Sequence, residues 1–216
     1  MIKITKSKEP IAWKRIRTTP GVTYEDAPKD ELRLSLFNEQ GGLCAYCMRS
    51  INITPGVPTT TRIEHIKPRK LSIKEGRVEE TLSYDNMILC CDGDIDGSGC
   101  FHCDRSKEDQ TISFSPLDQA VIDTISYSSK VGTIKSSNPK YNKEFNEVLN
   151  LNHPRIEASR LAVIKGLIIE IGKKKWKKKD LIDKLQYYSG YAANGQLHEY
   201  CGVVIWYLKK KLRQLV

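Results

Sequence analysis

The sequence lacks long hydrophobic runs. Its uncharged apolar stretches, such as residues 203–208, are far shorter than the roughly 20 residues that a membrane-spanning helix needs. Residues 1–10 also lack the apolar core of a secretory signal peptide. On this basis we expect a cytoplasmic protein with no membrane partner.

Acidic residues are fewer than basic ones. The 216 residues include 26 Asp and Glu against 35 Lys and Arg, which gives a formal net charge of +9. This excess indicates a polyanionic partner, and nucleic acid is the usual one. A hydrophobic content of 39% with charges of both signs excludes a disordered tail. The length suits one domain with an extension, or two small domains.

No internal repeat is found, and the chain divides into three parts. Residues 1–42 combine a basic arm with a helix predicted over residues 30–40, which begins at Asp30 as N-cap and ends at Gly41 and Gly42. The arm is either a packing segment or a segment that binds a partner or nucleic acid. Residues 43–115 have few periodic runs and are rich in Cys, Gly, Asp and Pro, which is typical of a small domain stabilised by a metal.

Short apolar segments set the order of elements in this middle part. Residues 61–66 and 84–89 predict two strands, and residues 104–109 could open a helix. Residues 116–216 are mainly helical, with apolar stripes in residues 161–171 and 197–215 and a shorter helix over 180–188. The stripes are either core or a subunit interface. The predicted fold class is therefore α+β.

Two lysine clusters lie in the C-terminal part. Residues 173–179 hold six lysines around Trp176, and residues 209–213 hold three lysines and an arginine. Such clusters are either a solvated surface, a site of phosphate contact or a surface for an acidic protein.

Cysteine spacing predicts a structural zinc site. In a reducing compartment, seven cysteines are better explained by metal binding than by disulfides. Cys44 and Cys47 form a Cys-x2-Cys turn, which supplies two of the four zinc ligands. Spacing alone favours Cys100 and Cys103 as the second pair, so rival ligand sets remain open. The candidates for that pair are Cys90, Cys91, Cys100, His102 and Cys103.

Glu64 and His65 lie between the two halves of this cysteine site. A carboxylate such as Glu64 can hold Mg²⁺, while the adjacent histidine deprotonates a water molecule. Asp104 would be a second oxygen ligand, and Lys107, one helical turn further, could meet a phosphate. Asn86 would fasten the loop that orients His65.

These motifs together resemble the HNH endonucleases, whose ββα-metal fold is stabilised by a zinc site. The resemblance is closest to the HNH subunit of Septu and Septu-like retron anti-phage systems, and residues 39–47 and 149–152 followed by Arg160 extend it. The matching blocks are Cys44-Ala-Tyr-Cys47, Arg62-Ile-Glu-His-Ile-Lys-Pro68, Tyr84-Asp-Asn-Met-Ile-Leu-Cys-Cys91 and Cys103-Asp-Arg-Ser-Lys107.

The chain departs from the family pattern at two places. Asp104 replaces the last family histidine, and an insertion over residues 92–102 widens the spacing between the last two cysteines. The family register places the third zinc ligand at Cys91 rather than Cys100. The resemblance thus implies a structural zinc held by Cys44, Cys47, Cys91 and Cys103.

The resemblance also implies a metal-dependent phosphodiester hydrolase that acts on DNA. His65 would activate water, Glu64 and Asp104 would hold one Mg²⁺ or Mn²⁺, Asn86 would orient the histidine loop, and Lys107 would stabilise the pentacovalent phosphorane. An ABC-type ATPase subunit is the expected partner, and a retron reverse transcriptase with its RNA–DNA product could join the complex. The alternatives are an RNA- or tRNA-cleaving effector and a non-catalytic zinc module that only binds nucleic acid.

Overall fold

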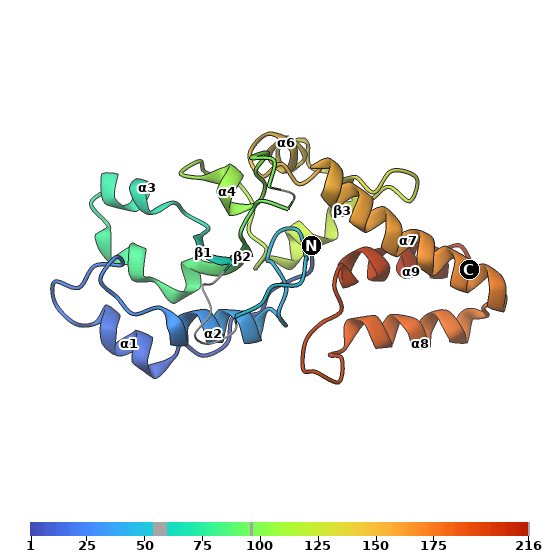
Figure 1. Cartoon of the computed structure of the whole chain (residues 1–216), viewed down its shortest axis with the longest axis horizontal. Helices are drawn as coiled ribbons and strands as arrows, with labels where there is room; N and C mark the ends of the chain where they lie inside the picture. The colour runs from blue at the N-terminus through green and yellow to red at the C-terminus, as the bar shows by residue number, and fades with distance from the viewer. Residues whose placement is uncertain (54–59, 96, 216) are drawn as a thin grey trace.

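A few short strands lie among the helices along the chain, which gives an α+β architecture (Figure 1). The computed structural model describes residues 1–53, 60–95 and 97–215. None of the helices in these residues combines the length and hydrophobicity that crossing a bilayer requires. Residues 54–59 of the predicted middle domain, and Asp96 of its insertion, lie outside the described residues. The elements before the C-terminal part are α1 (Ile11–Arg17), α2 (Asp30–Glu39), β1 (Thr61–His65), α3 (Arg69–Lys74), η1 (Val78–Leu82), η2 (Tyr84–Asn86), β2 (Met87–Cys91) and α4 (Asp104–Lys107).

An antiparallel hairpin forms the centre of the middle part. In the β1–β2 pair, Thr61 lies opposite Cys91 and His65 lies opposite Met87. All five residues of β2 are buried. The outer edge of β2 is covered by α2, because the Gln40 side chain accepts a hydrogen bond from Leu89 N (2.7 Å) and donates one to Leu89 O (2.8 Å). These bonds occupy backbone groups that would otherwise form an open sheet edge.

The middle part has the predicted two strands followed by a helix, but the segment between the strands, predicted as a loop, contains the helices α3 and η1. The second strand begins at Met87 rather than residue 84, because residues 84–86 form the turn η2. Helix α4 has only four residues and begins directly after Cys103, at Asp104.

The N-terminal part contains one helix more than predicted. Helix α1 was not expected, and its Trp13 is buried, with the indole N–H donating to Leu82 O at 3.0 Å. Helix α2 has Lys29 rather than Asp30 at its N-cap. Its end agrees with the prediction, since Gly41 and Gly42 both have positive φ, which stops a helix.

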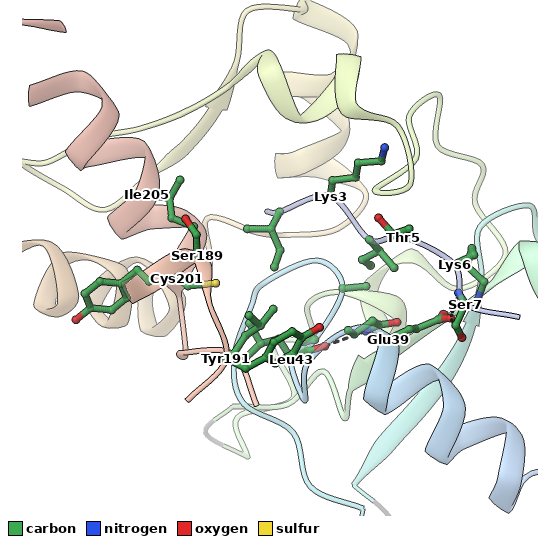
Figure 2. Close-up of a pocket in the computed structure, with 17 residues that line it drawn as sticks. Lys3, Thr5, Lys6, Ser7, Glu39, Leu43, Ser189, Tyr191, Cys201 and Ile205 are labelled. Atoms are coloured by element: carbon green, nitrogen blue, oxygen red, sulfur yellow. Dashed lines mark hydrogen bonds and ion pairs between the residues drawn. The ribbon is translucent and has the colours of Figure 1, made fainter. Parts of the chain in front are cut away.

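The basic arm packs along the middle of the molecule. Ile4 is buried and its N–H donates to Pro116 O at 3.0 Å. Lys6 forms a 2.6 Å ion pair with Glu39 at the end of α2. Figure 2 shows the arm from Lys3 to Ser7 beside a pocket of about 510 Å³, with Cys201 and Ile205 of α9 on the far side. The first residues thus act as a packing segment that joins the two halves of the chain.

The C-terminal part is mainly helical but also contains a small hairpin that was not predicted. Strands β3 and β4 pair antiparallel, and their three residues each are too few to give a sequence pattern. Of the predicted apolar stripes, Ile164 and Leu208 are buried, whereas Ile168 and Leu215 are exposed. The elements are α5 (Gln119–Asp123), β3 (Ile125–Tyr127), β4 (Ile134–Ser136), α6 (Pro139–Glu147), α7 (Pro154–Lys174), α8 (Lys178–Ser189) and α9 (Cys201–Arg213).

Candidate metal centre and adjoining acidic cleft

Four buried thiols from three separate segments meet at one point. Cys44 and Cys47 lie in the turn after α2, Cys91 ends β2, and Cys103 immediately precedes α4. Their sulfur atoms all lie within 4.8 Å of one another. The cluster could therefore hold a metal ion.

Two of the sulfur–sulfur distances match those of a zinc site. The Sγ atoms of Cys44 and Cys103 are 3.8 Å apart, as are those of Cys47 and Cys91. A tetrahedral zinc site with Zn–S bonds of about 2.3 Å has sulfur–sulfur edges of about 3.8 Å. Four cysteine thiolates are also a donor set that structural zinc prefers.

The rival ligands are placed differently. Cys100 is exposed, and Cys90 is buried but is not one of the four. His102 is buried beside the cluster, with Nδ1 at 3.2 Å from the Cys103 sulfur and 3.9 Å from the Cys91 sulfur. Burial lowers the pKa of His102 to about 4, so it stays neutral beside the thiols.

A basic side chain accompanies the cluster. Arg49 pairs with Asp92, and although burial opposes its charge, Cys91, Cys47 and Asp92 raise its pKa further. A zinc ion bound by four thiolates carries two negative charges, and Arg49 is placed to balance part of them. Sequence reasoning did not identify this residue, although it lies only two positions after Cys47.

Glu64 and Asp104 line one cleft of about 310 Å³ and lie within hydrogen-bond reach of each other, and Asp104 also pairs with Arg62. Glu64 is the penultimate residue of β1 and Asp104 is the first residue of α4, so the hairpin and the helix bring them together. Burial, followed by the hydrogen bond with Asp104, raises the pKa of Glu64 to about 8. Two carboxyl groups in this arrangement share a proton or hold a cation between them. The cleft lining comprises Arg62, Ile63, Glu64, His65, Pro68, Arg69, Asp104, Glu108 and Asp109.

Lys107 does not take the predicted orientation toward a phosphate. Its side chain is fully buried, and Nζ lies 2.8 Å from Glu64 Oε1. The same ammonium donates to His65 O at 3.2 Å, and Tyr46 OH donates to Glu64 Oε1 at 3.0 Å. The short helix α4 thus turns Lys107 inward, where it holds the Glu64 carboxyl and the β1 backbone.

His65 is held as a neutral imidazole. Its Nε2 lies 2.9 Å from Thr81 O, and a carbonyl oxygen can only accept a hydrogen bond, so Nε2 carries the proton. Nδ1 therefore keeps a lone pair. Burial lowers the pKa of His65 to about 4, and the Tyr24 ring packs edge-on against it at 4.7 Å between centroids. Neither Thr81 nor Tyr24 lies in a motif that sequence reasoning could use.

Asn86 fastens the chain just beyond His65. Its side chain accepts a hydrogen bond from Lys67 N at 2.8 Å and donates one to Lys67 O at 2.9 Å. Its own carbonyl accepts from Ile66 N at 3.0 Å. Asn86 thus acts on the two residues after His65 rather than on the imidazole.

The thiol cluster adjoins the cleft but shares no residue with it, since Cys103 immediately precedes Asp104. Within the β1–β2 pair, Cys91 lies opposite Thr61 and His65 lies opposite Met87, about 13 Å further along at the rise of a β-strand. A metal at the cluster could therefore fix the hairpin and α4 without entering the cleft. No protein-family model matches this sequence, and no curated protein matches it either.

Proposed function

We propose that this protein is a metal-dependent endonuclease of the HNH type, with DNA as its preferred substrate. The observation that carries the proposal is the state of His65, a neutral imidazole whose Nδ1 is available to accept a proton beside two facing carboxyl groups. Phosphodiester hydrolysis needs a general base for the attacking water and a centre that neutralises charge on the phosphate. The cleft offers residues for both.

The proposed roles are assigned to residues that line the cleft and to two that hold this lining in place. His65 accepts the proton of the attacking water at Nδ1, while Nε2–H remains bonded to Thr81 O. Glu64 and Asp104 would hold one Mg²⁺ or Mn²⁺ ion, which supplies charge neutralisation at the scissile phosphate when bound. Asn86 keeps the backbone after His65 in place, and Lys107 positions Glu64.

The four thiols have a structural role in this proposal. Cys44, Cys47, Cys91 and Cys103 would hold zinc, joining the α2 turn, β2 and α4 into one unit. The antiparallel β1–β2 pair followed by α4 has the order of a ββα-metal core, which supports the HNH interpretation. The proposed role in anti-phage defence, with an ABC-type ATPase and in some systems a retron, rests on the motif resemblance.

A cleavage assay with matched variants tests the nuclease proposal. The full-length chain, alone and with the ATPase partner, is incubated with Mg²⁺ or Mn²⁺ and plasmid DNA. We expect cleavage by the native chain and by His198→Ala, because His198 lies outside the cleft, and none by His65→Ala. Undiminished cleavage by His65→Ala would remove the catalytic assignment.

Parallel reactions with total RNA and tRNA separate the alternatives. Cleavage of RNA alone, again dependent on His65, would replace DNA with RNA as the substrate. Nucleic-acid binding without cleavage in every reaction would favour the zinc module that only binds.

A further inference from the structure

The excess positive charge of the chain is concentrated in two segments. Residues 170–184 hold seven lysines and three acidic residues, and residues 209–213 hold four basic residues and none that is acidic. The rest of the chain has 24 basic and 23 acidic residues and is therefore nearly neutral. The net charge of +9 is thus almost entirely a property of these two segments.

The fold brings the two segments to the same end of the molecule. Residues 173–179 form the end of α7, the turn and the start of α8, and residues 209–213 form the end of α9. Helices α8 and α9 pack together in opposite directions, so the start of one lies beside the end of the other (Figure 1). We call this region, residues 173–179 and 209–213, the basic tip.

The basic tip lies far from the cleft. Figure 1 shows the α7–α8 turn at one end of the long axis of the molecule, with β1, α3 and α4 in the other half. The tip therefore cannot contact the same phosphate as His65. A single ligand that occupies both the tip and the cleft must therefore extend across the protein.

Most of the tip lysines have no acidic partner among the described residues. Within the tip, Lys174 alone approaches a carboxylate, at 3.8 Å from Glu170, and Glu170 also binds Lys184 at 3.0 Å. The Asp180 carboxylate accepts a hydrogen bond from Lys177 N at 2.6 Å. The lysines over residues 173–179 are all exposed. Like charges held this close repel one another, which an external polyanion relieves.

Helix stability does not explain these lysines. Lys178 and Lys179 lie in the first turn of α8, where a positive charge opposes the helix dipole. Their position is unfavourable for the helix itself. A role in binding accounts for them better.

Aromatic surface lies among the charges. Trp176 and the exposed Tyr187 border a pocket of about 350 Å³, which is also lined by Lys174, Lys184, Asp180 and Asp183. The Lys184 ammonium lies 5.6 Å from the centre of the Trp176 ring and 5.4 Å from that of Tyr187. Lysines beside aromatic rings are the combination with which proteins track a nucleic-acid backbone and stack on its bases.

We infer that the basic tip is a nucleic-acid binding site, separate from the cleft, that anchors a long substrate by its phosphate backbone. The choice of nucleic acid as the polyanion rests on the proposed function. Because lysines act as point charges, the tip contributes affinity without reading sequence. Substrates too short to reach from the cleft to the tip gain nothing from it.

The test uses two variants with the same change in net charge. The tip variant replaces Lys175, Lys177, Lys178 and Lys179 by Gln, and its fold is expected to persist because two of these cations oppose the dipole of α8. The control variant replaces four exposed lysines elsewhere by Gln, namely Lys130, Lys135, Lys140 and Lys165. Both are made in the His65→Ala chain, and fluorescence anisotropy measures binding to a labelled DNA duplex without added divalent metal.

We expect the tip variant to bind the duplex about tenfold more weakly or worse, and the control variant to bind nearly as the parent does. The slope of log K against log salt should become shallower by about 3 to 4 in the tip variant, because each lost phosphate contact removes about 0.9. Equal loss in both variants, or normal binding by the tip variant, would overturn the inference. Equally tight binding of polyglutamate would instead identify the tip as a surface for acidic proteins.

The two proposals fail separately. Tip-dependent binding in a chain that never cleaves would remove the nuclease proposal and leave the tip site. Cleavage that depends on His65, with binding that is independent of the tip, would remove the tip site and leave the nuclease proposal.

Discussion

Nζ of Lys107 lies 2.8 Å from Oε1 of Glu64, and the two side chains are 0% and 3% exposed. A buried ammonium loses its hydration, and here the Glu64 carboxyl and the His65 carbonyl replace it. The pair joins α4 to β1 from inside. Lys107 is therefore a part of the framework of the cleft rather than of its surface.

Replacing Lys107 by Met should destabilise the protein strongly. The substitution keeps the apolar stem but leaves the buried Glu64 carboxyl and the His65 carbonyl without the donor that they share, and each unsatisfied buried acceptor costs about 1–3 kcal/mol. Urea unfolding of the zinc-loaded chain measures the change. Adding Glu64→Gln to this variant should recover part of the loss, because it removes the unpaired acid.

Lys70→Met provides the matched control for Lys107→Met. Lys70 also pairs with a carboxylate, that of Asp109, but its side chain is 78% exposed. Exposed pairs contribute little to stability because solvent screens them, so this variant should unfold almost as the native chain does. Equal effects of the two substitutions would contradict the inward role of Lys107.

Cysteine variants should distinguish the members of the thiol cluster from their neighbours. We expect Cys91→Ser to lose bound zinc and to lower the melting temperature sharply, because a structural zinc site needs all four ligands. Cys100→Ser should keep about one zinc ion per chain. Metal content is measured by mass spectrometry after purification, and full zinc in Cys91→Ser would show that the cluster has a different third ligand.

Asn86→Ala should lower cleavage while zinc content is maintained. The substitution removes both side-chain hydrogen bonds to Lys67 and frees the segment that follows His65. A displacement of about 1 Å at a general base can cost on the order of 10²-fold in rate. The measurement is the single-turnover rate of plasmid cleavage at saturating Mg²⁺.

Asn146→Ala is the control for Asn86→Ala. Its side chain also donates to a backbone carbonyl, that of Asn142, but it is exposed and lies on α6. A normal rate in Asn146→Ala and a reduced one in Asn86→Ala would assign the effect to the His65 segment. An unchanged rate in Asn86→Ala would leave Asn86 with no positioning role.

Strands β1 and β2 and the Cys-x2-Cys turn could be predicted from the sequence because they are local patterns, whereas β3 and β4 are too short to give one. The alternation in residues 61–66 predicts β1 closely, and the Cys44-x2-Cys47 turn forms within a few residues. Spacing alone could not identify the third thiol of the cluster. The Cys-x2-Cys spacing favours Cys100 as the partner of Cys103, but Cys100 is exposed. Only the path of the chain from β2 to α4 brings Cys91 into contact with the other three thiols.

The surroundings of His65 and Lys107 could not be predicted because they depend on tertiary packing. Tyr24 reaches His65 from a loop without periodicity, and Thr81 contributes only its backbone carbonyl. Helix α4 is too short for a pattern that would show which side faces inward. The spacing of one helical turn predicts that Lys107 lies on the same side as Asp104, near the carboxyl pair. The spacing does not predict whether the ammonium group faces solvent.

Gly202 and Gly166 should respond in opposite directions to replacement by Ala, because both are helical but only one is confined. A methyl group at Gly202, in α9, would lie 2.7 Å from Met48 Sδ, 2.8 Å from Ile2 Cγ2 and 2.8 Å from Met1 O. One of these three atoms belongs to the backbone, which has little freedom to move. At Gly166, in α7, no atom lies within 4 Å of the added carbon.

Gly166→Ala should therefore stabilise the chain by roughly 0.5–1 kcal/mol, the usual helix preference of Ala over Gly. Gly202→Ala gains the same preference but must displace the basic arm or the Met48 turn, and overpacking of this kind costs about 1–3 kcal/mol. Thermal unfolding of both zinc-loaded variants shows whether each substitution raises or lowers the stability. Stabilisation by both substitutions would mean that the arm is not held tightly against α9. A loss of stability in Gly202→Ala alone would support the arm as the segment that connects the C-terminal helices to the metal centre.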